Sequence, residues 1–101
     1  MAMSLFCYSS KSPSALQVIV DAIANQHKDI FEKKFLVSDI CPAGSVQKEI
    51  ALDYGFRANS FFLISYNEKL ATIPSSVVID LIKESIGIDD VLVLFENEEL
   101  R

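Results

Sequence analysis

Two cysteines are the residues of this 101-residue chain whose side chains are best suited to covalent chemistry. Cys7 begins the segment Cys7-Tyr8-Ser9-Ser10, and a cysteine thiolate can attack a disulfide. Because Cys7 lies within an apolar run, we expect a buried thiol with a raised pKa, whereas Cys41 opens a Pro-Gly turn and is expected to be accessible. If the strands that precede them are parallel, the two thiols lie at one end of the sheet and can form a redox pair.

A serine-rich segment, Ser10-Lys11-Ser12-Pro13-Ser14, joins the first predicted strand to the first predicted helix. Ser12 followed by Pro13 is typical of a helix N-cap and the first helical position. Lys11 is predicted to be an exposed loop residue, with contact to an anion near the helix N-terminus as the alternative.

The single histidine, His27, falls near the end of that first helix. A cation there stabilises the helix C-terminus, and we favour this interpretation over a titrating functional group. One histidine and two cysteines do not supply the ligands of a typical zinc site, so we expect no metal and no other cofactor.

Apolar periodicity predicts the elements that position these side chains. Strands are predicted at residues 4–8, 35–37, 61–66, 70–73 and 91–95, and helices at residues 13–27, 45–54 and 75–86. The first strand, helix and next strand predict two parallel strands joined by a crossover, and the third and fourth strands predict a hairpin. The sequence therefore predicts a single α/β domain over residues 1–101, with a mixed sheet of about four to five strands and helices on both faces.

Charge and hydropathy restrict the partners and the location. The formal net charge is −5 and the nine Lys and Arg residues never cluster beyond Lys33-Lys34, so neither nucleic acid nor an anionic membrane is expected as a partner. The longest apolar run, Val91–Phe95, is far shorter than a membrane span, and the first residues lack the pattern of a signal peptide. We therefore expect a cytoplasmic protein.

The order of the predicted elements resembles the thioredoxin fold, and residues 54–67 strengthen the resemblance. In thioredoxins a helix ends in Tyr-Gly-Ile-Arg and leads through an Ile-Pro-Thr turn into a buried strand. Here Tyr54-Gly55-Phe56-Arg57 precedes the predicted strand 61–66. The resemblance covers residues 4–87 and leaves residues 88–101 as an additional C-terminal segment.

The resemblance implies a degenerate member of the thioredoxin-like family. The Cys-x-x-Cys motif is replaced either by residues 12–15 or by residues 10–13, which places Ser12 or Ser10 at the position of the nucleophile. The Asn59-Ser60 dipeptide stands where the family has the cis-proline that faces this motif. The family's peptide-binding groove is therefore expected between these two segments, without its thiols.

Three functions remain open from the sequence. The first is a redox-inactive, thioredoxin-like interaction or adaptor module that binds another protein and has no enzymatic activity. The second is an atypical redox protein that uses Cys7 or Cys41. The third is a docking or sensor module similar to the KaiB family, because the spacing of Tyr8 and Pro13 resembles the start of the first helix in that family.

The segment Val91–Phe95 is not explained by the thioredoxin resemblance. Five consecutive apolar residues form a strand that needs cover on both faces. The sheet edge beside residues 35–37 lacks the N-terminal strand found in thioredoxins, so we expect Val91–Phe95 to fill that edge. The strand would come from the same chain in a monomer, which we favour, or from a second chain in a homodimer.

Overall fold

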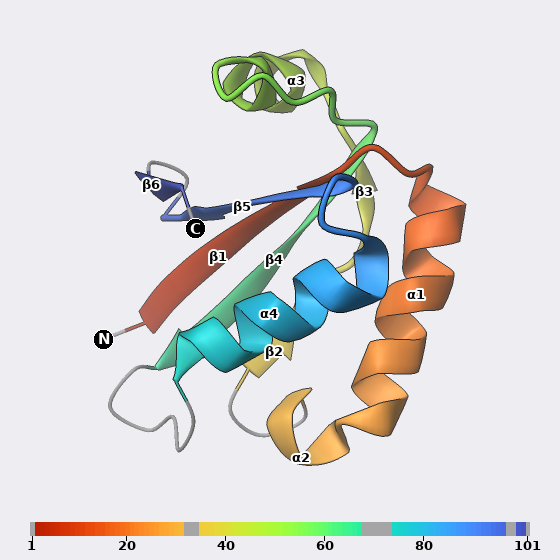
Figure 1. The fold of residues 1–101 in the computed structure, drawn as a ribbon, viewed down its shortest axis with the longest axis vertical. Coiled ribbons are helices and arrows are strands. Elements are labelled where there is room, and N and C mark those ends of the chain that lie inside the picture. The colour runs from red at the N-terminus through yellow and green to blue at the C-terminus, as the bar shows by residue number, and fades with distance from the viewer. Residues whose placement is uncertain (1, 32–34, 68–73, 97–98, 101) are drawn as a thin grey trace.

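The computed structural model describes residues 2–31, 35–67, 74–96 and 99–100. Its elements follow the chain in the order β1 (Ala2–Ser9), α1 (Pro13–Gln26), α2 (Lys28–Phe31), β2 (Phe35–Val37), β3 (Cys41–Pro42), α3 (Ser45–Leu52), β4 (Ser60–Asn67), α4 (Ser75–Ile86), β5 (Val91–Phe95) and β6 (Glu99–Leu100). The strands form one sheet in the order β2-β4-β1-β5-β6, and β3 also pairs with β4 (Figure 1).

Every strand pair in the described part of the sheet is antiparallel. The predicted mixed sheet is therefore wrong. β1 and β2 do run parallel to each other, as predicted, but β4 lies between them and pairs antiparallel with both. The α/β class and the strands near residues 4–8, 35–37 and 61–66 are confirmed. The strand predicted at residues 70–73 lies outside the described residues.

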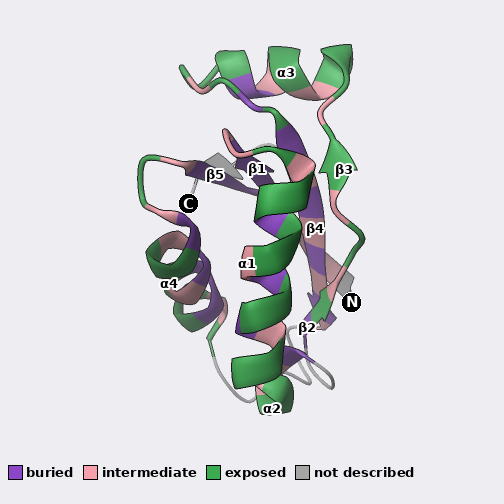
Figure 2. Cartoon of the chain, turned by 90° about the vertical axis from the view of Figure 1, so that its right-hand side faces the viewer, coloured by how far each residue is buried: buried purple, intermediate pink, exposed green. Residues whose placement is uncertain are grey.

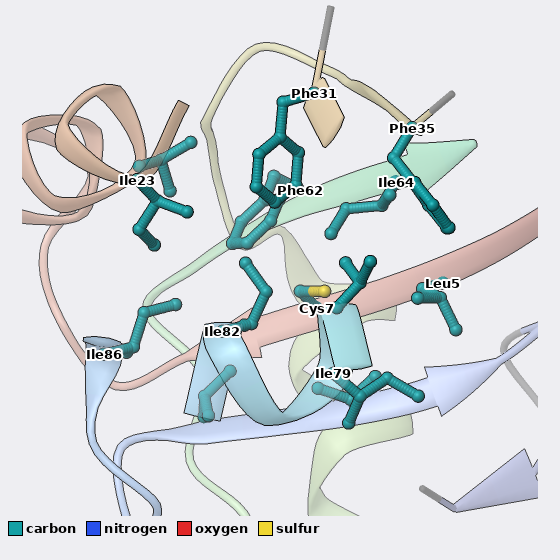
Figure 3. Packing of buried hydrophobic residues seen from close by; sticks show 14 of the residues in the cluster. Leu5, Cys7, Ile23, Phe31, Phe35, Phe62, Ile64, Ile79, Ile82 and Ile86 are labelled. Carbon is teal, nitrogen blue, oxygen red and sulfur yellow. The ribbon is translucent and has the colours of Figure 1, made fainter. Parts of the chain in front are cut away.

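The main core lies between one face of the sheet and the two long helices. Figure 1 shows α4 running across this face, with α1 beside it. Alternate residues of β1 and β4 point towards these helices, because successive strand residues face opposite sides of a sheet. The largest side chains that this core buries completely are Leu5, Leu16, Phe35, Phe62, Ile64 and Ile82 (Figure 3).

A second, smaller cluster lies on the opposite face. It contains Tyr8, Leu92 and Leu94 from the sheet and Ala51 from α3. Phe6 and Phe61 pack against the cluster and are only partly buried. Figure 1 shows α3 beyond one end of the sheet, so this helix covers only part of the second face.

The start of α1 and the end of α4 lie where they were predicted, whereas α3, predicted to reach residue 54, ends at Leu52. The Ser12 hydroxyl accepts a hydrogen bond from the Ala15 amide, and Pro13 occupies the first helical position of α1. Gly87 follows α4 with a φ of 116°, a conformation that side chains with a Cβ rarely adopt. The short elements α2, β3 and β6 were not predicted, because two to four residues carry too little periodicity.

Strand β5 occupies a different position from the one predicted. It pairs with β1 in the same chain, with Val91 opposite Ser9 and Phe95 opposite Leu5. The strand itself and its pairing within one chain are confirmed, but β5 does not lie at the edge beside β2, where it was predicted. Four of its five residues are buried, because the two core clusters cover its two faces. Within the described residues, no helix is long and apolar enough to cross a membrane.

Candidate functional site

The two thiols lie on opposite faces of the sheet. Cys7 stands opposite Phe62 on β4, whereas Cys41 stands opposite Phe61, the preceding residue of the same strand. Neighbouring residues of a strand point to opposite faces, so β4 separates the thiols. The predicted redox pair is therefore wrong.

Cys7 is buried and Cys41 is exposed, as predicted. Figure 3 shows the sulfur of Cys7 among the aliphatic and aromatic side chains of the main core. Burial raises the pKa of the Cys7 thiol far above its ordinary value of about 9, because the apolar core disfavours the thiolate. Cys7 is thus a core residue and not a nucleophile.

The serine-rich turn and the start of β4 lie against each other. The side-chain amide of Asn59 donates a hydrogen bond to the carbonyl oxygen of Ser10 at 2.5 Å, and the hydroxyl of Ser60 donates to the carbonyl oxygen of Lys11 at 2.8 Å. The sequence predicted that these segments face each other across a groove, and the structure shows them in direct contact. Hydrogen bonds join the two segments directly at these points. That a peptide binds between the two segments stays a prediction.

Asp90, which the sequence analysis did not single out, joins the same cluster from the turn before β5. Its backbone carbonyl oxygen accepts a hydrogen bond from the hydroxyl of Ser9 at 2.9 Å, and its carboxylate accepts one from the hydroxyl of Ser10 at 3.2 Å. The ammonium of Lys11 lies 3.8 Å from the second carboxylate oxygen. The predicted exposed loop lysine is therefore a partly buried member of an ion pair.

This cluster offers no free group for catalysis. Ser9 and Ser60 are fully buried, and both hydroxyls donate to backbone carbonyl oxygens. Among the described residues, no buried side-chain nitrogen or oxygen lacks a hydrogen-bond partner. The remaining predicted serines, Ser12 and Ser14, lie at the exposed start of α1, where Ser12 serves as the N-cap. The cluster fixes one end of the sheet rather than activating a nucleophile.

His27 is the C-cap residue of α1, and its amide donates to the carbonyl oxygen of Ile23. This position agrees with the helix-terminal role that the sequence favoured. In the part of the chain that the structure describes, no group of three histidine, cysteine, aspartate or glutamate side chains is arranged to hold a metal ion.

The surface of the described residues carries exposed apolar side chains and open depressions. The large hydrophobic residues that are more than half exposed are Val18, Leu36, Val46, Leu52 and Ile88. One depression of about 300 Å³ lies between α1 and β2, and another of about 320 Å³ is lined by Leu52, Ala58 and Arg57. These residues come from α1, β2, α3 and the turn after α4, so they are spread over the surface.

The chain is similar over nearly its whole length to known proteins of one family. Residues 1–99 match the family model of the CDI System Immunity Component. The chain is 36% identical to Immunity protein CdiI-2 of Burkholderia pseudomallei (strain 1026b) over 101 residues, which is the whole length of both chains. It is also similar to a chain of the solved CdiA-CT/CdiI toxin and immunity complex from Burkholderia pseudomallei. The TM-score is 0.91 and the identity 34%, over 97% of this chain and 95% of the other.

These matches overturn the family and functions inferred from the sequence. The similarity to an immunity component extends over nearly all residues, whereas the thioredoxin resemblance rested on short segments and on an order of elements that produces antiparallel pairs in place of the predicted mixed sheet. The thioredoxin-like adaptor, the atypical redox thiol and the KaiB-like module are all incorrect. Only the general expectation of a protein-binding role agrees with the comparisons.

Proposed function

The chain belongs to the family of CDI system immunity components, and we propose that it binds a CdiA-CT toxin and thereby neutralises it. The observation that carries this proposal is the likeness to a chain of a solved toxin and immunity complex, because that likeness covers nearly the whole of both chains. Because the fold of this chain is similar to that of the matched chain from end to end, it can present a toxin with a similarly shaped surface.

The chemistry of the described residues supports binding rather than catalysis. The buried thiol of Cys7 is held in its neutral form, and the polar cluster around Ser60 uses its hydroxyls for internal hydrogen bonds. A protein that blocks a toxin by occupying its surface needs neither an activated nucleophile nor a cofactor. It needs a rigid surface, and exposed apolar side chains are available here on α1, β2 and α3.

The proposal is tested with the CdiA-CT domain encoded in the same genome. The toxin domain is expressed from an inducible promoter in a sensitive bacterial host, with and without this chain, and growth is followed after induction. The purified proteins are then mixed and analysed by size-exclusion chromatography with light scattering. We expect restored growth and a complex that elutes as a single species.

A matched control separates binding from general effects of expression. Leu94→Asp places a charge in the smaller core cluster and is expected to unfold the chain, so that it neither binds nor protects. If the wild-type chain is folded by circular dichroism but forms no complex and does not protect the host, the proposed function is wrong.

A further inference from the structure

The sheet has an open edge at β2. The order of strands begins with β2, which pairs with β4 on one side. No described strand lies on its other side, and β5, which was expected there, pairs with β1 instead. An exposed sheet edge presents unpaired backbone groups to any chain that can extend beside it.

The hydrogen-bond pattern shows which backbone groups of β2 face outwards. The amide of Ser38 donates to the carbonyl oxygen of Leu63 at 2.8 Å, so the backbone of Ser38 faces β4. Residues of an antiparallel strand alternate between its two neighbours, so Leu36 also faces β4, whereas Phe35 and Val37 direct their amide and carbonyl groups to the open side. The open edge therefore carries two donors and two acceptors at strand spacing.

A groove lies along this edge, between β2 and α1. It measures about 300 Å³, and its apolar lining comes from Val20, Ala24, Phe31, Leu36 and Val37. Figure 2 shows β2 beside α1, whose outer surface is exposed. A strand added at β2 would place alternate side chains into this groove, where Leu36, which is 60% exposed, offers further apolar surface.

The polar lining of the groove is acidic. Asp21 on α1 and Asp39 after β2 both line it, and both are exposed. Among the described residues that line the groove, none carries a positive charge. Among the described lining residues, a basic side chain that enters the groove would therefore meet two carboxylates and no cation.

We propose that β2 is a docking edge for an extended, basic segment of the toxin, which adds a strand to the sheet and places a lysine or arginine between Asp21 and Asp39. The inference rests on the proposed function. A second copy of this chain is a poorer occupant, because pairing β2 with β2 would bring the same carboxylates together on chains that each carry a net charge of −5.

The decisive variant removes one outward backbone donor. Val37→Pro eliminates the Val37 amide, which does not pair with β4, and proline is tolerated on the outer side of an edge strand. Val37→Thr is the matched control, because it keeps both the amide and a β-branched side chain. By isothermal titration calorimetry we expect Val37→Pro to weaken toxin binding roughly tenfold and Val37→Thr to bind as the wild type does.

A second measurement uses the unmodified chain and does not depend on the folding of a variant. Amide hydrogen exchange is compared for the free chain and for its complex with the toxin domain. We expect the amides of Phe35 and Val37 to gain protection in the complex, because they enter a new ladder. The double variant Asp21→Asn, Asp39→Asn tests the charge, and its binding is expected to depend less on salt concentration than that of the wild type.

The outcomes separate the two proposals. If the wild-type chain does not bind the toxin at all, the proposed function fails. If it binds but Phe35 and Val37 gain no protection and folded Val37→Pro binds normally, the docking edge is wrong while the proposed function stands. A homodimer of the free chain that Val37→Pro dissociates would also overturn the docking edge as the toxin's site.

Discussion

The hydroxyl of Ser60 donates a hydrogen bond to the carbonyl oxygen of Lys11 across 2.8 Å, which ties the start of β4 to the turn before α1. Ser60 is fully buried, so its loss leaves the Lys11 carbonyl without this partner in a site that water does not reach. The two segments are far apart in the sequence, and this contact holds them in register with β1.

We therefore predict that Ser60→Ala lowers the free energy of unfolding by about 1–3 kcal/mol, the cost of an unsatisfied buried acceptor. Urea denaturation followed by circular dichroism measures the change. Ser85→Ala, at an exposed position of α4, is the matched control and is expected to change stability by less than about 0.5 kcal/mol. Equal effects of the two substitutions would contradict the role assigned to Ser60.

The two thiols are predicted to differ in reactivity. Cys41 is exposed and is expected to react with iodoacetamide in the folded protein, whereas Cys7 is expected to react only after unfolding, because burial keeps it protonated and inaccessible. Mass spectrometry of peptides from timed labelling reports both rates. Labelling of Cys7 at the rate of Cys41 in the native protein would show that the core is open at β1.

Alkaline pH is predicted to destabilise the chain through Cys7. The folded pKa lies above the unfolded one, so the folded state keeps a proton that the unfolded state releases. This stabilisation is complete below the unfolded pKa of about 9, and it falls as the pH rises further, by up to about 1.4 kcal/mol per pH unit. Urea denaturation between pH 8 and pH 10.5, about one unit below to one and a half above that pKa, measures the slope. Cys7→Ala is expected to be less stable overall but to lose this part of the pH dependence.

The smaller core cluster is predicted to contribute to folding even though it is only partly covered. Leu94 is completely buried there, so Leu94→Ala is expected to cost about 2–5 kcal/mol of unfolding free energy. Leu52→Ala is the matched control at a side chain that is 56% exposed, and it is expected to cost much less. Thermal and urea unfolding of both variants check the difference. A small effect at Leu94 would mean that the second face is not a true core.

Local signals predicted the elements of this fold well. The bounds of α4 and β2 were predicted to the residue, and Ser12-Pro13 marked a helix start that the structure confirms. These signals work because caps, turns and periodicity act over a few residues. The neighbours of a strand are set by contacts over long sequence distances, and an apolar run such as residues 4–8 fits between antiparallel neighbours as well as beside a parallel one.

The candidate site was harder to predict from the sequence than the helices and strands were. The meeting of Ser10 and Lys11 with Asn59 and Ser60 was anticipated through a family resemblance that proved wrong, so the placement was useful while its interpretation was not. Asp90 was missed because nothing local marks an aspartate as the partner of a distant turn. A binding surface also has no sequence motif. An apolar residue such as Leu36 can be recognised as exposed only once the fold shows that no other element covers it.

The central position of β1 has a consequence for synthesis of the chain. Both neighbours of this strand are made late, since Ser9 pairs with Ser60 and with Val91. The first strand leaves the ribosome long before either of its partner strands has been synthesised. The apolar side chains of this strand therefore cannot yet pack in a sheet. High contact order of this kind slows folding, and the sheet closes only when translation is nearly complete. Any protection that the protein gives its host therefore begins with finished chains and not with nascent ones.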